Sequence, residues 1–430
     1  MSFTLDLTGD QEKLRDRAHA FAREVIRPAA TEYDRAQELP WPILQEATRQ
    51  GFYDWQLYGT LVADPTGLSL PILMEELFWG CAGIGLCIVL PALALAAIRQ
   101  AATDEQLARW APECFGRVDD IKLGALAVTE PSGGSDIHSI QTRARRAGED
   151  WVIDGQKVFI GNGGIADVHV VVATVDPEAG HRGQGVFIVP KGTPGLKMLR
   201  KLDKLGCRAS HTGEIVFEDC RVPGENLLGG EQRLAERIAK GREAERGSPP
   251  PASTTEGGQA AAVQRRSSAA LGAFERTRPM VAAQAIGIAR AALEFARDYA
   301  VSREAFGQPI IENQGISFPL ADLAADIDAA RLLTWRAAWM ASQGLPFEHA
   351  EGSMSKLKAS EVAVQACEQA VQTMGGWGYV KDFPVEKWYR DAKLYTIFEG
   401  TSEIQRLVIG RALRAVANTE PLNERMGAPR

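Results

Sequence analysis

A glutamate near the C-terminus stands where a largely apolar segment meets a flexible turn. Glu399 follows the segment 394–398 and precedes Gly400. Apolar surroundings disfavour the ionised form of a carboxyl group and raise its pKa, and Gly400 allows a ligand to approach the backbone closely. Glu399 could therefore serve as a general base. The alternative is that Glu399 caps a helix that begins at Thr401 and Ser402.

A second segment, 127–136, combines three hydroxyl groups with a pair of glycines. Thr129, Ser132 and Ser135 can all hydrogen-bond, and the two glycines between them let backbone N–H groups turn toward an anion. Such a loop could bind a diphosphate or the edge of a flavin ring. An ordinary turn rich in glycine and serine is the alternative.

The composition is that of a globular protein without a general affinity for nucleic acid. The 430 residues are 45% hydrophobic and can form two or three domains. A net charge of -7 argues against nucleic acid as the main partner. The six cysteines show no CxxC spacing, which predicts neither a disulfide framework nor a metal site. The segment 1–10 lacks the regions of a secretory signal, so a reducing, cytoplasmic location is expected.

One uncharged segment, 77–98, is long enough to suggest a membrane helix. Three glycines crowd its first half, Pro91 interrupts its middle, and the chain offers no second span or orientation signal. A helix that is apolar all round also suits the core of a large protein. We therefore expect no membrane span.

Residues 1–120 are predicted to form an α-helical domain. Apolar residues recur at helical spacing from Leu14 to Ile26, and Pro28 follows them as an expected stop. Further helices are expected over 42–51, after Glu76 and over 104–110.

Residues 121–230 are predicted to form an antiparallel β domain, with a barrel as one arrangement. Asp154 and Gly155 are typical of a hairpin turn. Short β-branched or aromatic segments occur at 151–153, 158–160, 168–174, 186–189 and 214–218.

Residues 231–268 are predicted to be an inserted, mobile loop, because 247–258 has the composition of a linker. The charged segment 232–246 could be a helix, although Leu234 and Ile238 offer little apolar surface. A surface loop is the simple interpretation, and a role in gating or docking is the alternative.

Residues 269–418 are predicted to form a helical domain resembling a four-helix bundle, followed by a tail over 419–430. An apolar stripe runs from Val281 to Tyr299, and further helices are expected over 316–343, 351–374 and 401–417.

This order of domains and three motifs resemble the acyl-CoA dehydrogenase family, most closely its short- and medium-chain members. The motifs are 127–136, then 372–382 with Lys387 and Asp391 behind it, and 390–406. The resemblance extends from about Leu5 to Ala415, except for 231–268. It implies an α+β fold with an N-terminal α-helical domain, a central antiparallel β domain and a C-terminal four-helix-bundle-like domain.

The resemblance implies FAD-dependent α,β-dehydrogenation of an acyl-CoA thioester to the trans-2-enoyl-CoA in fatty acid β-oxidation. Glu399 would remove the α-proton, its backbone N–H would help to stabilise the thioester oxygen, and electrons would pass to an electron-transferring flavoprotein. Some members place their base at the position of Thr277, which cannot take a proton from carbon, so the role stays with Glu399.

The resemblance also assigns binding residues. Arg303 and Phe306 would reach the FAD of a neighbouring subunit, which requires at least a dimer and fits a homotetramer; a solvated arginine at a helix end is the alternative for Arg303. The other expected FAD contacts are Thr129, Ser135, Phe159, Ile160, Gln372, Gly375, Gly376 and Thr401. The expected substrate contacts are Ser135, Arg278, Gly400, Gly85 and Val89.

The sequence departs from the family at Gly161, where members usually carry a threonine or serine whose hydroxyl approaches flavin N5. An oxidase or a dehydrogenase of acyl-carrier-protein thioesters therefore stays open, as does a flavin-binding scaffold without turnover. The resemblance implies that the apolar segment after Glu76 lines the acyl pocket. Because 77–98 holds no Arg or Lys to pair with the second carboxylate of a glutaryl-like substrate, a neutral acyl chain is expected. Its length and branching are left open.

Overall fold

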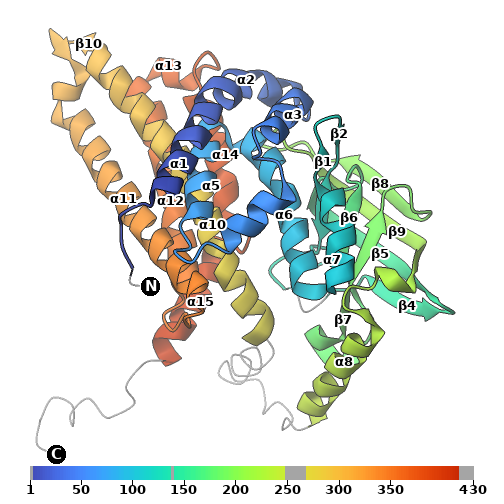
Figure 1. Cartoon of the computed structure of the whole chain (residues 1–430). Coiled ribbons are helices and arrows are strands. Elements are labelled where there is room, and N and C mark those ends of the chain that lie inside the picture. The colour runs from blue at the N-terminus through green and yellow to red at the C-terminus, as the bar shows by residue number, and fades with distance from the viewer. Residues whose placement is uncertain (1–2, 137–139, 247–267, 416–430) are drawn as a thin grey trace, which may run out of the picture.

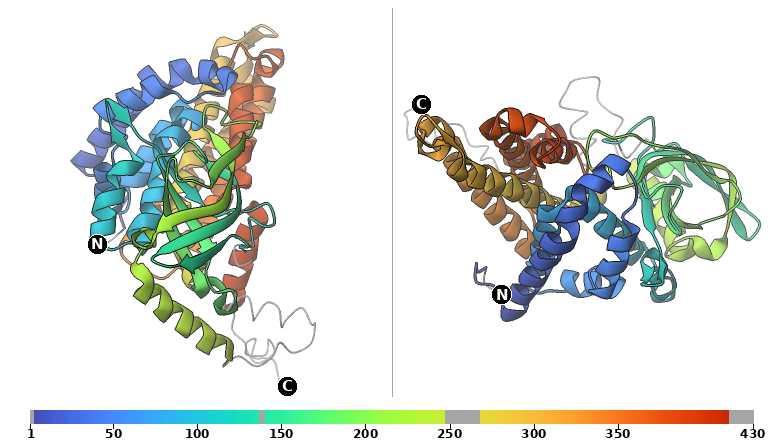
Figure 2. Two further views of the ribbon diagram at one scale, coloured as in Figure 1. Left: turned by 90° about the vertical axis from the view of Figure 1, so that its right-hand side faces the viewer. Right: turned by 90° about the horizontal axis from the view of Figure 1, so that it is seen from above.

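The protein consists of an N-terminal helical part, a middle β part and a C-terminal helical part (Figure 1). Residues 3–136, 140–246 and 268–415 are described in this computed structural model. Seen from above, the sheet curls on one side of the molecule and the long C-terminal helices lie on the other (Figure 2). The predicted order of the three domains is confirmed.

The N-terminal part is a stack of short helices around one apolar core. Thr8 begins the first helix with a capping box, in which Thr8 and Gln11 each bond the other's backbone N–H. The helices are α1 Gly9–Phe21, α2 Arg27–Ala36, α3 Trp41–Arg49, α4 Trp55–Val62, α5 Ser69–Gly80, α6 Ala82–Ala101 and α7 Asp104–Trp110.

The predicted stop at Pro28 is wrong, because the chain stays helical through this residue. A π-helical turn, η1 Ala22–Ile26, lies directly before α2 and places Pro28 in the first turn of that helix. A proline costs little there, since first-turn N–H groups lack helical acceptors anyway.

The break between α5 and α6 falls at Cys81, whose backbone is extended. Helix α6 is long and apolar enough to cross a membrane, but 67% of its apolar window is buried inside the fold. It packs against α5 and β3. This burial is the pattern expected of a core helix.

The middle part is built on a seven-stranded sheet in the order β3-β6-β4-β5-β9-β8, with β7 paired to β6. The prediction of an antiparallel sheet is wrong for two pairings, because β3 and β4 both run parallel to β6. The strands are β3 Gly124–Ala127, β4 Arg143–Ala147, β5 Asp150–Gly161, β6 Val168–Thr174, β7 Gln184–Pro190, β8 Leu196–Lys201 and β9 Thr212–Pro223. A separate small hairpin, β1 Gly116–Arg117 and β2 Asp120–Ile121, precedes them.

The hairpin turn predicted at Asp154 and Gly155 is also wrong. These residues lie inside β5, where the pairing with β9 shifts register between Ile153 and Gly155. A Cβ on Gly155 would lie 2.5 Å from the Thr142 hydroxyl oxygen, so the glycine permits a close approach of two strands rather than a turn.

The prediction of a mobile loop over 231–268 is wrong for its first half, which is helix α8 Gly230–Arg246. Leu234 is buried, and the Arg242 guanidinium lies 2.7 Å from the Asp176 carboxylate. These contacts dock α8 against η4 Pro177–Gly183 despite its small apolar surface. Residues 247–267 lie outside the described residues.

The C-terminal part is a bundle in which α10 packs against α12, α11 and α5. The long helices are α10 Ser268–Ser302, α11 Gln314–Ser342, α12 Glu351–Met374 and α15 Ser402–Ala415. The helices predicted over 316–343 and 351–374 are confirmed, whereas α13 Gly376–Tyr379 and α14 Val385–Lys393 were not predicted. The tail 419–430 lies outside the described residues.

Candidate active site

Glu399 lies in a tight turn between two helical elements. Helix α14 continues into the short η7 Leu394–Thr396, and α15 begins at Ser402. Between them, Glu399 and Gly400 adopt consecutive left-handed conformations, with φ of 53° and 86°. A left-handed backbone is uncommon for residues other than glycine, and strain of this kind concentrates at functional sites. The turn leaves the Glu399 side chain half-buried.

Two buried side chains hold this turn by its carbonyl groups. The Gly400 carbonyl accepts hydrogen bonds from the Lys356 ammonium and the Gln405 amide, both at 2.8 Å. Gln405 also donates to the Glu399 carbonyl at 3.2 Å. The φ of 86° favours glycine at position 400, and a Cβ there would also lie 2.7 Å from the Gln405 amide nitrogen. Neither Lys356 nor Gln405 was identified from the sequence.

Helix α15 is capped by Thr401 and not by Glu399. The Thr401 hydroxyl oxygen accepts a hydrogen bond from the Ile404 N–H at 3.3 Å, the geometry of an N-cap residue. The interpretation of Glu399 as a helix cap is therefore wrong, and its carboxylate is available for another role.

The Glu399 carboxylate is close to positive charge without being paired to it. Within the described part of the chain, it accepts no hydrogen bond and forms no ion pair. Burial raises its pKa above the ordinary value of 4.5, and the charges of Lys356 and Arg278 partly oppose this rise. A carboxyl group with a raised pKa and an unoccupied oxygen is suited to accept a proton.

Arg278, a predicted substrate contact, lies beside the same turn. It is buried in α10 and donates a hydrogen bond to the Ser353 hydroxyl of α12. A Cβ on Gly400 would lie 3.8 Å from one Arg278 guanidinium nitrogen. Arg278, Glu399 and Gly400 are therefore brought together in the fold. Thr277 is exposed on α10.

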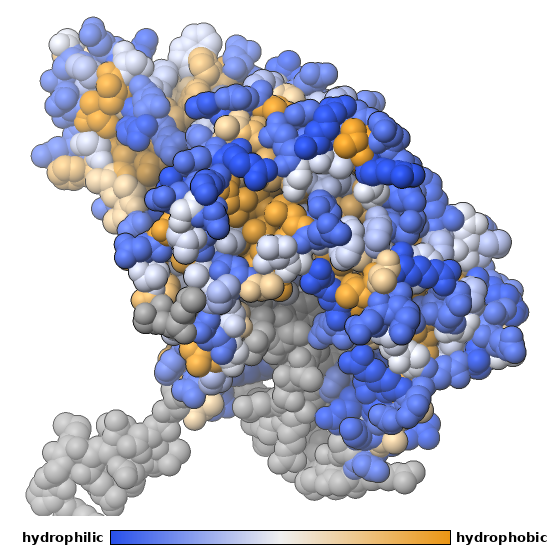
Figure 3. All heavy atoms as spheres, in the orientation of Figure 1, coloured by the Kyte–Doolittle hydropathy of each residue, from blue (hydrophilic) through white to orange (hydrophobic). Residues whose placement is uncertain are grey.

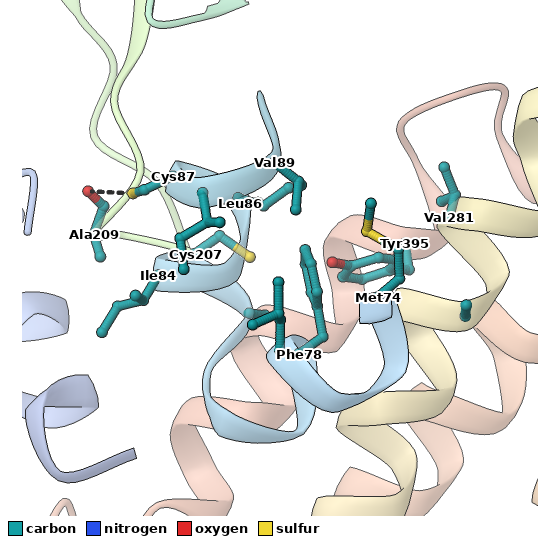
Figure 4. Packing of buried hydrophobic residues seen from close by; sticks show 14 of the residues in the cluster. Met74, Phe78, Ile84, Leu86, Cys87, Val89, Cys207, Ala209, Val281 and Tyr395 are labelled. Carbon is teal, nitrogen blue, oxygen red and sulfur yellow. Dashed lines mark hydrogen bonds between the residues drawn. The ribbon is translucent and has the colours of Figure 1, made fainter. Parts of the chain in front are cut away.

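An apolar wall borders the segment that leads to Glu399. Tyr395 is buried, packs edge-on against Phe78 and Phe398, and donates to the Gln284 side chain at 3.2 Å. Figure 4 shows Phe78 and Met74 of α5 beside Tyr395, with Val89 on the neighbouring helix α6. Gly85 allows the Phe78 ring to approach α6, since a Cβ there would lie 3.0 Å from the ring. Gly85 and Val89, both predicted substrate contacts, belong to this buried wall.

The hydroxyl-rich loop 127–136 is anchored by a buried ion pair that the sequence did not reveal. The Lys157 ammonium lies 2.9 Å from the Glu130 carboxylate and also donates to the Val128 carbonyl. Glu130 accepts further bonds from the backbone N–H groups of Gln141 and Thr142. This anchoring places Thr129 against β5, where its carbonyl accepts from Val158 N–H. Ser135, farther along the loop, is exposed.

Strand β5 presents a flat aromatic ring next to this loop. Phe159 has a φ of 60°, and 69% of its surface is exposed. Ile160, in contrast, is 2% exposed, and its side chain belongs to the core. That Phe159 and Ile160 lie against a flavin ring stays a prediction, and the Phe159 ring is the more accessible of the two side chains.

Gly161 is covered by a leucine from the helical part. A Cβ on Gly161 would lie 2.8 Å and 3.0 Å from the two terminal methyl carbons of Leu90 on α6. A threonine or serine at this position would require Leu90 to move. The side chain missing at position 161 and the leucine that covers it thus compensate for each other in volume.

The other predicted cofactor residues lie elsewhere. Arg303 and Phe306 belong to the β10–β11 hairpin (Glu304–Ala305 and Gln308–Pro309), at the end of the bundle remote from the sheet in Figures 1 and 2. Gln372, Gly375 and Gly376, at the end of α12, are exposed. One chain therefore does not bring these residues together with Thr129 and Phe159.

Thr401 lines a hollow of about 370 Å³ next to the Glu399 turn. Its other walls come from α12, from the segment before the turn and from the start of α15, including Gln365, Lys393 and Arg406. A larger hollow of about 850 Å³ between η4 and α8 contains none of the predicted site residues. In the described ranges, no cluster of His, Cys, Asp and Glu side chains could hold a metal ion.

Known proteins share this architecture over nearly the whole chain. The sequence matches the family models of the acyl-CoA dehydrogenase N-terminal domain over 8–116, middle domain over 125–220 and C-terminal domain over 267–414. It is 38% identical over 415 residues to the mitochondrial short-chain specific acyl-CoA dehydrogenase of Rattus norvegicus, covering 96% of this chain and 92% of the relative.

Two solved structures extend the comparison. The butyryl-CoA dehydrogenase of Megasphaera elsdenii is 34% identical, with a TM-score of 0.80 and coverage of 96% of this chain and 100% of that one. A chain from the structure of the electron transferring flavoprotein of Acidaminococcus fermentans is also 34% identical, with a TM-score of 0.79 and coverage of 95% and 99%. Together with the three matched domains, these similarities show that the protein is an enzyme of the acyl-CoA dehydrogenase family.

Proposed function

We propose that the protein catalyses FAD-dependent α,β-dehydrogenation of a short, neutral acyl-CoA thioester to the trans-2-enoyl-CoA. The observation that carries this proposal is the Glu399 turn: a half-buried carboxylate with a raised pKa and, in the described residues, no hydrogen-bond partner. A proton on the α-carbon of a thioester is weakly acidic, so it requires a base held close to it in surroundings with little water.

The side chain and the backbone of the turn can have different roles in the reaction. The Glu399 carboxylate accepts the α-proton. The backbone N–H groups of Glu399 and Gly400 find no acceptor in the described structure, so they are available to donate to the thioester oxygen as negative charge develops there. Such donors are effective because the fold fixes them before the reaction begins.

The apolar wall around Tyr395 has a separate task. It excludes water from the acyl chain and restricts the orientation of the reacting carbons. Gly85 and Val89 would contact the acyl chain along this wall. Arg278, next to Gly400, is placed to contact the thioester end of the substrate.

The residues on the sheet fit a flavin. Phe159 offers an exposed aromatic ring, and the loop that carries Thr129 and Ser135 is fixed in place by the Glu130–Lys157 pair. FAD, when bound, supplies the acceptor for the hydride that leaves the β-carbon. Thr129, Ser135, Phe159, the backbone of Ile160, and Thr401 would hold it from one chain.

The remaining cofactor residues support a homotetramer, or at least a dimer. Phe306 is 98% exposed, and apolar side chains show on the surface at this end of the bundle (Figure 3). Trp377 and Tyr379 of α13 are also exposed. We expect this end to meet a second copy, so that Arg303, Phe306, Gln372, Gly375 and Gly376 contact the neighbour's FAD.

The electron acceptor and the cellular compartment are also part of the proposal. The similarity to a chain from an electron transferring flavoprotein structure supports such a flavoprotein as electron acceptor, within fatty acid β-oxidation. All six cysteines are buried free thiols, which suits a reducing compartment such as the cytoplasm.

The test is a panel of straight, branched and cyclic acyl-CoAs, beginning with butyryl-CoA, mixed with the purified holoenzyme without oxygen. Flavin bleaching with formation of the 2-enoyl-CoA is expected. Rapid peroxide formation in air would instead indicate an oxidase, and a marked preference for acylated carrier protein would indicate a different substrate. A flavin that no thioester bleaches would contradict the proposal.

A further inference from the structure

Lys356 differs from the other buried lysines of the described chain. Lys157 and Lys387 each lie within 3 Å of a carboxylate, at 2.9 Å from Glu130 and 2.5 Å from Asp391. Lys356 is equally buried, with 0% of its surface exposed, yet it forms no ion pair with any described residue. Lysine is almost never fully buried without a paired charge, because removing an ammonium group from water is costly. This cost indicates a role beyond packing.

In the described structure, the Lys356 ammonium group donates a hydrogen bond to one group, the carbonyl of Gly400. This carbonyl belongs to the left-handed turn that carries Glu399, and Gln405 is its second donor. Lys356 comes from α12 and Gln405 from α15, so two different helices donate hydrogen bonds to the turn. Loss of either donor would leave the partly buried Gly400 carbonyl with one hydrogen bond instead of two and let the strained turn relax.

The charges around the turn come from three helices. Arg278 of α10 and Lys356 of α12 are the cations that act on Glu399. Glu403 of α15 and Glu361 of α12 act on Lys356 in addition to Glu399. The Glu399 carboxylate is thus near the Lys356 charge without bonding to it, which leaves its oxygens accessible to a substrate.

We propose that Lys356 is a positioning residue for the reaction: its ammonium group holds the Gly400 carbonyl, fixes the left-handed turn and keeps the neighbouring Glu399 carboxylate ionised and correctly aimed. This inference rests on the proposed function of Glu399 as the base. It assigns to a residue outside the reacting groups both a mechanical and an electrostatic part in catalysis.

The electrostatic part has a definite sign. Burial raises the pKa of Glu399 and the Lys356 charge lowers it, so removal of that charge raises the pKa further. A base with a higher pKa is protonated over more of the neutral range, so the rise of the reaction rate with pH moves to higher pH. Burial also lowers the pKa of Lys356 to about 8, whereas an arginine in its place would keep its charge.

The experiment compares Lys356→Met, which keeps most of the side-chain length but has no charge and no hydrogen-bond donor, with Lys356→Arg, which keeps the charge and the donor. The matched control is Lys358→Met, on the same helix but partly exposed and ion-paired to Asp326 at 2.6 Å. For each holoenzyme, the limiting rate of anaerobic flavin bleaching by butyryl-CoA is measured over a pH series. The melting temperature and the flavin content of each variant are recorded in parallel.

Lys356→Met is expected to lose at least about tenfold in limiting rate at neutral pH, as misplacement of a catalytic group does. Its rate should rise with pH about one unit later than that of wild type, the lower end of the effect of one neighbouring charge. Lys356→Arg should recover part of the rate and restore the pH profile. Lys358→Met should behave as wild type.

A Lys356→Met enzyme with wild-type rate and pH profile would overturn the inference. So would a uniform loss of rate with an unmoved pH profile that arginine does not improve, since that pattern indicates packing alone. If the methionine variant does not fold, Lys356→Gln against Lys356→Arg gives the same contrast between a neutral and a charged donor. The proposed function fails separately, when Glu399→Gln is as active as wild type.

Discussion

Two glutamates of this protein, Glu75 and Glu399, carry the same side chain in opposite electrostatic situations. Glu75, on α5, is 6% exposed and lies 2.8 Å from Arg290 and 3.0 Å from Arg331. Burial alone would raise its pKa, but the two arginines lower the pKa below the ordinary value of 4.5. At Glu399, the cations are near but unbonded, and the pKa is raised.

The difference separates a carboxylate that joins domains from one that is free to react. Arg290 belongs to α10, Arg331 to α11 and Glu75 to α5, so their ion pairs connect the C-terminal bundle to the N-terminal part. The Glu75 carboxylate is therefore occupied by ion pairs that hold the fold together. Glu399 keeps its oxygens uncommitted because the neighbouring cations bind a carbonyl and a hydroxyl instead.

The largest change in stability is expected when the ion pairs around Glu75 are broken. Arg290→Met should lower the free energy of unfolding by about 3 kcal/mol, because it removes a partner from both Glu75 and Glu76 in a buried site. Denaturant unfolding of the holoenzyme measures this. Arg297→Met, which removes an exposed pair on the same helix, should change the stability by less than about 1 kcal/mol. Equal effects of the two variants would contradict the assignment.

A smaller effect is expected from a change of volume without a change of charge. Gly161→Thr should cost about 1 to 2 kcal/mol, since its Cβ meets the flexible end of Leu90. Leu90→Ala in the same protein should recover most of that cost, and thermal melting of the two single variants and the double variant measures the coupling. Additive losses would show that Leu90 and Gly161 do not compensate for each other.

The smallest effect concerns the pH dependence of stability and has opposite signs at the two glutamates. A carboxyl group whose pKa is raised by folding stabilises the protein below pH 4.5, and this contribution is lost as the pH rises toward the folded pKa. Glu399→Gln should therefore be more stable than wild type at neutral pH by about 1.4 kcal/mol for each unit of the rise, and lose this advantage in acid.

Glu75→Gln provides the opposite case. Because folding lowers the pKa of Glu75, its contribution is present above pH 4.5 and is lost as the pH falls through the lower folded pKa. The glutamine variant should be less stable than wild type at neutral pH. The melting temperatures of both variants are measured at a series of pH values. If the two variants changed in stability with pH in the same direction, the two glutamates would not be in opposite electrostatic situations.

The domain order and the long helices could be predicted because they depend on local periodicity. The helix predicted over 351–374, for example, has the same bounds as α12. Pro28 and the pair Asp154–Gly155 misled the prediction because neighbours decided the outcome: a π turn accommodates the proline, and Thr142 fills the space beside Gly155. Propensity reports what a segment prefers alone, and packing can override it.

Glu399 could be predicted as a candidate base because its apolar neighbours precede it in the sequence. The residues that support it could not, since they act over long separations: Lys356 is 44 residues from Gly400, and Leu90 comes from a different domain than Gly161. One signal was present for Lys356. It lies on the face of α12 that also carries Ser353, Ser360 and Ala363, all of them buried, and a lone charge on such a face is unusual.

The most direct test of the account is the rate of anaerobic flavin bleaching by butyryl-CoA in Glu399→Gln, whose amide keeps the shape of the carboxylate but cannot accept the α-proton. We expect a loss of about a thousandfold or more, with flavin content and melting temperature at neutral pH equal to or above those of wild type. A variant that bleaches at a near wild-type rate would show that another group removes the proton.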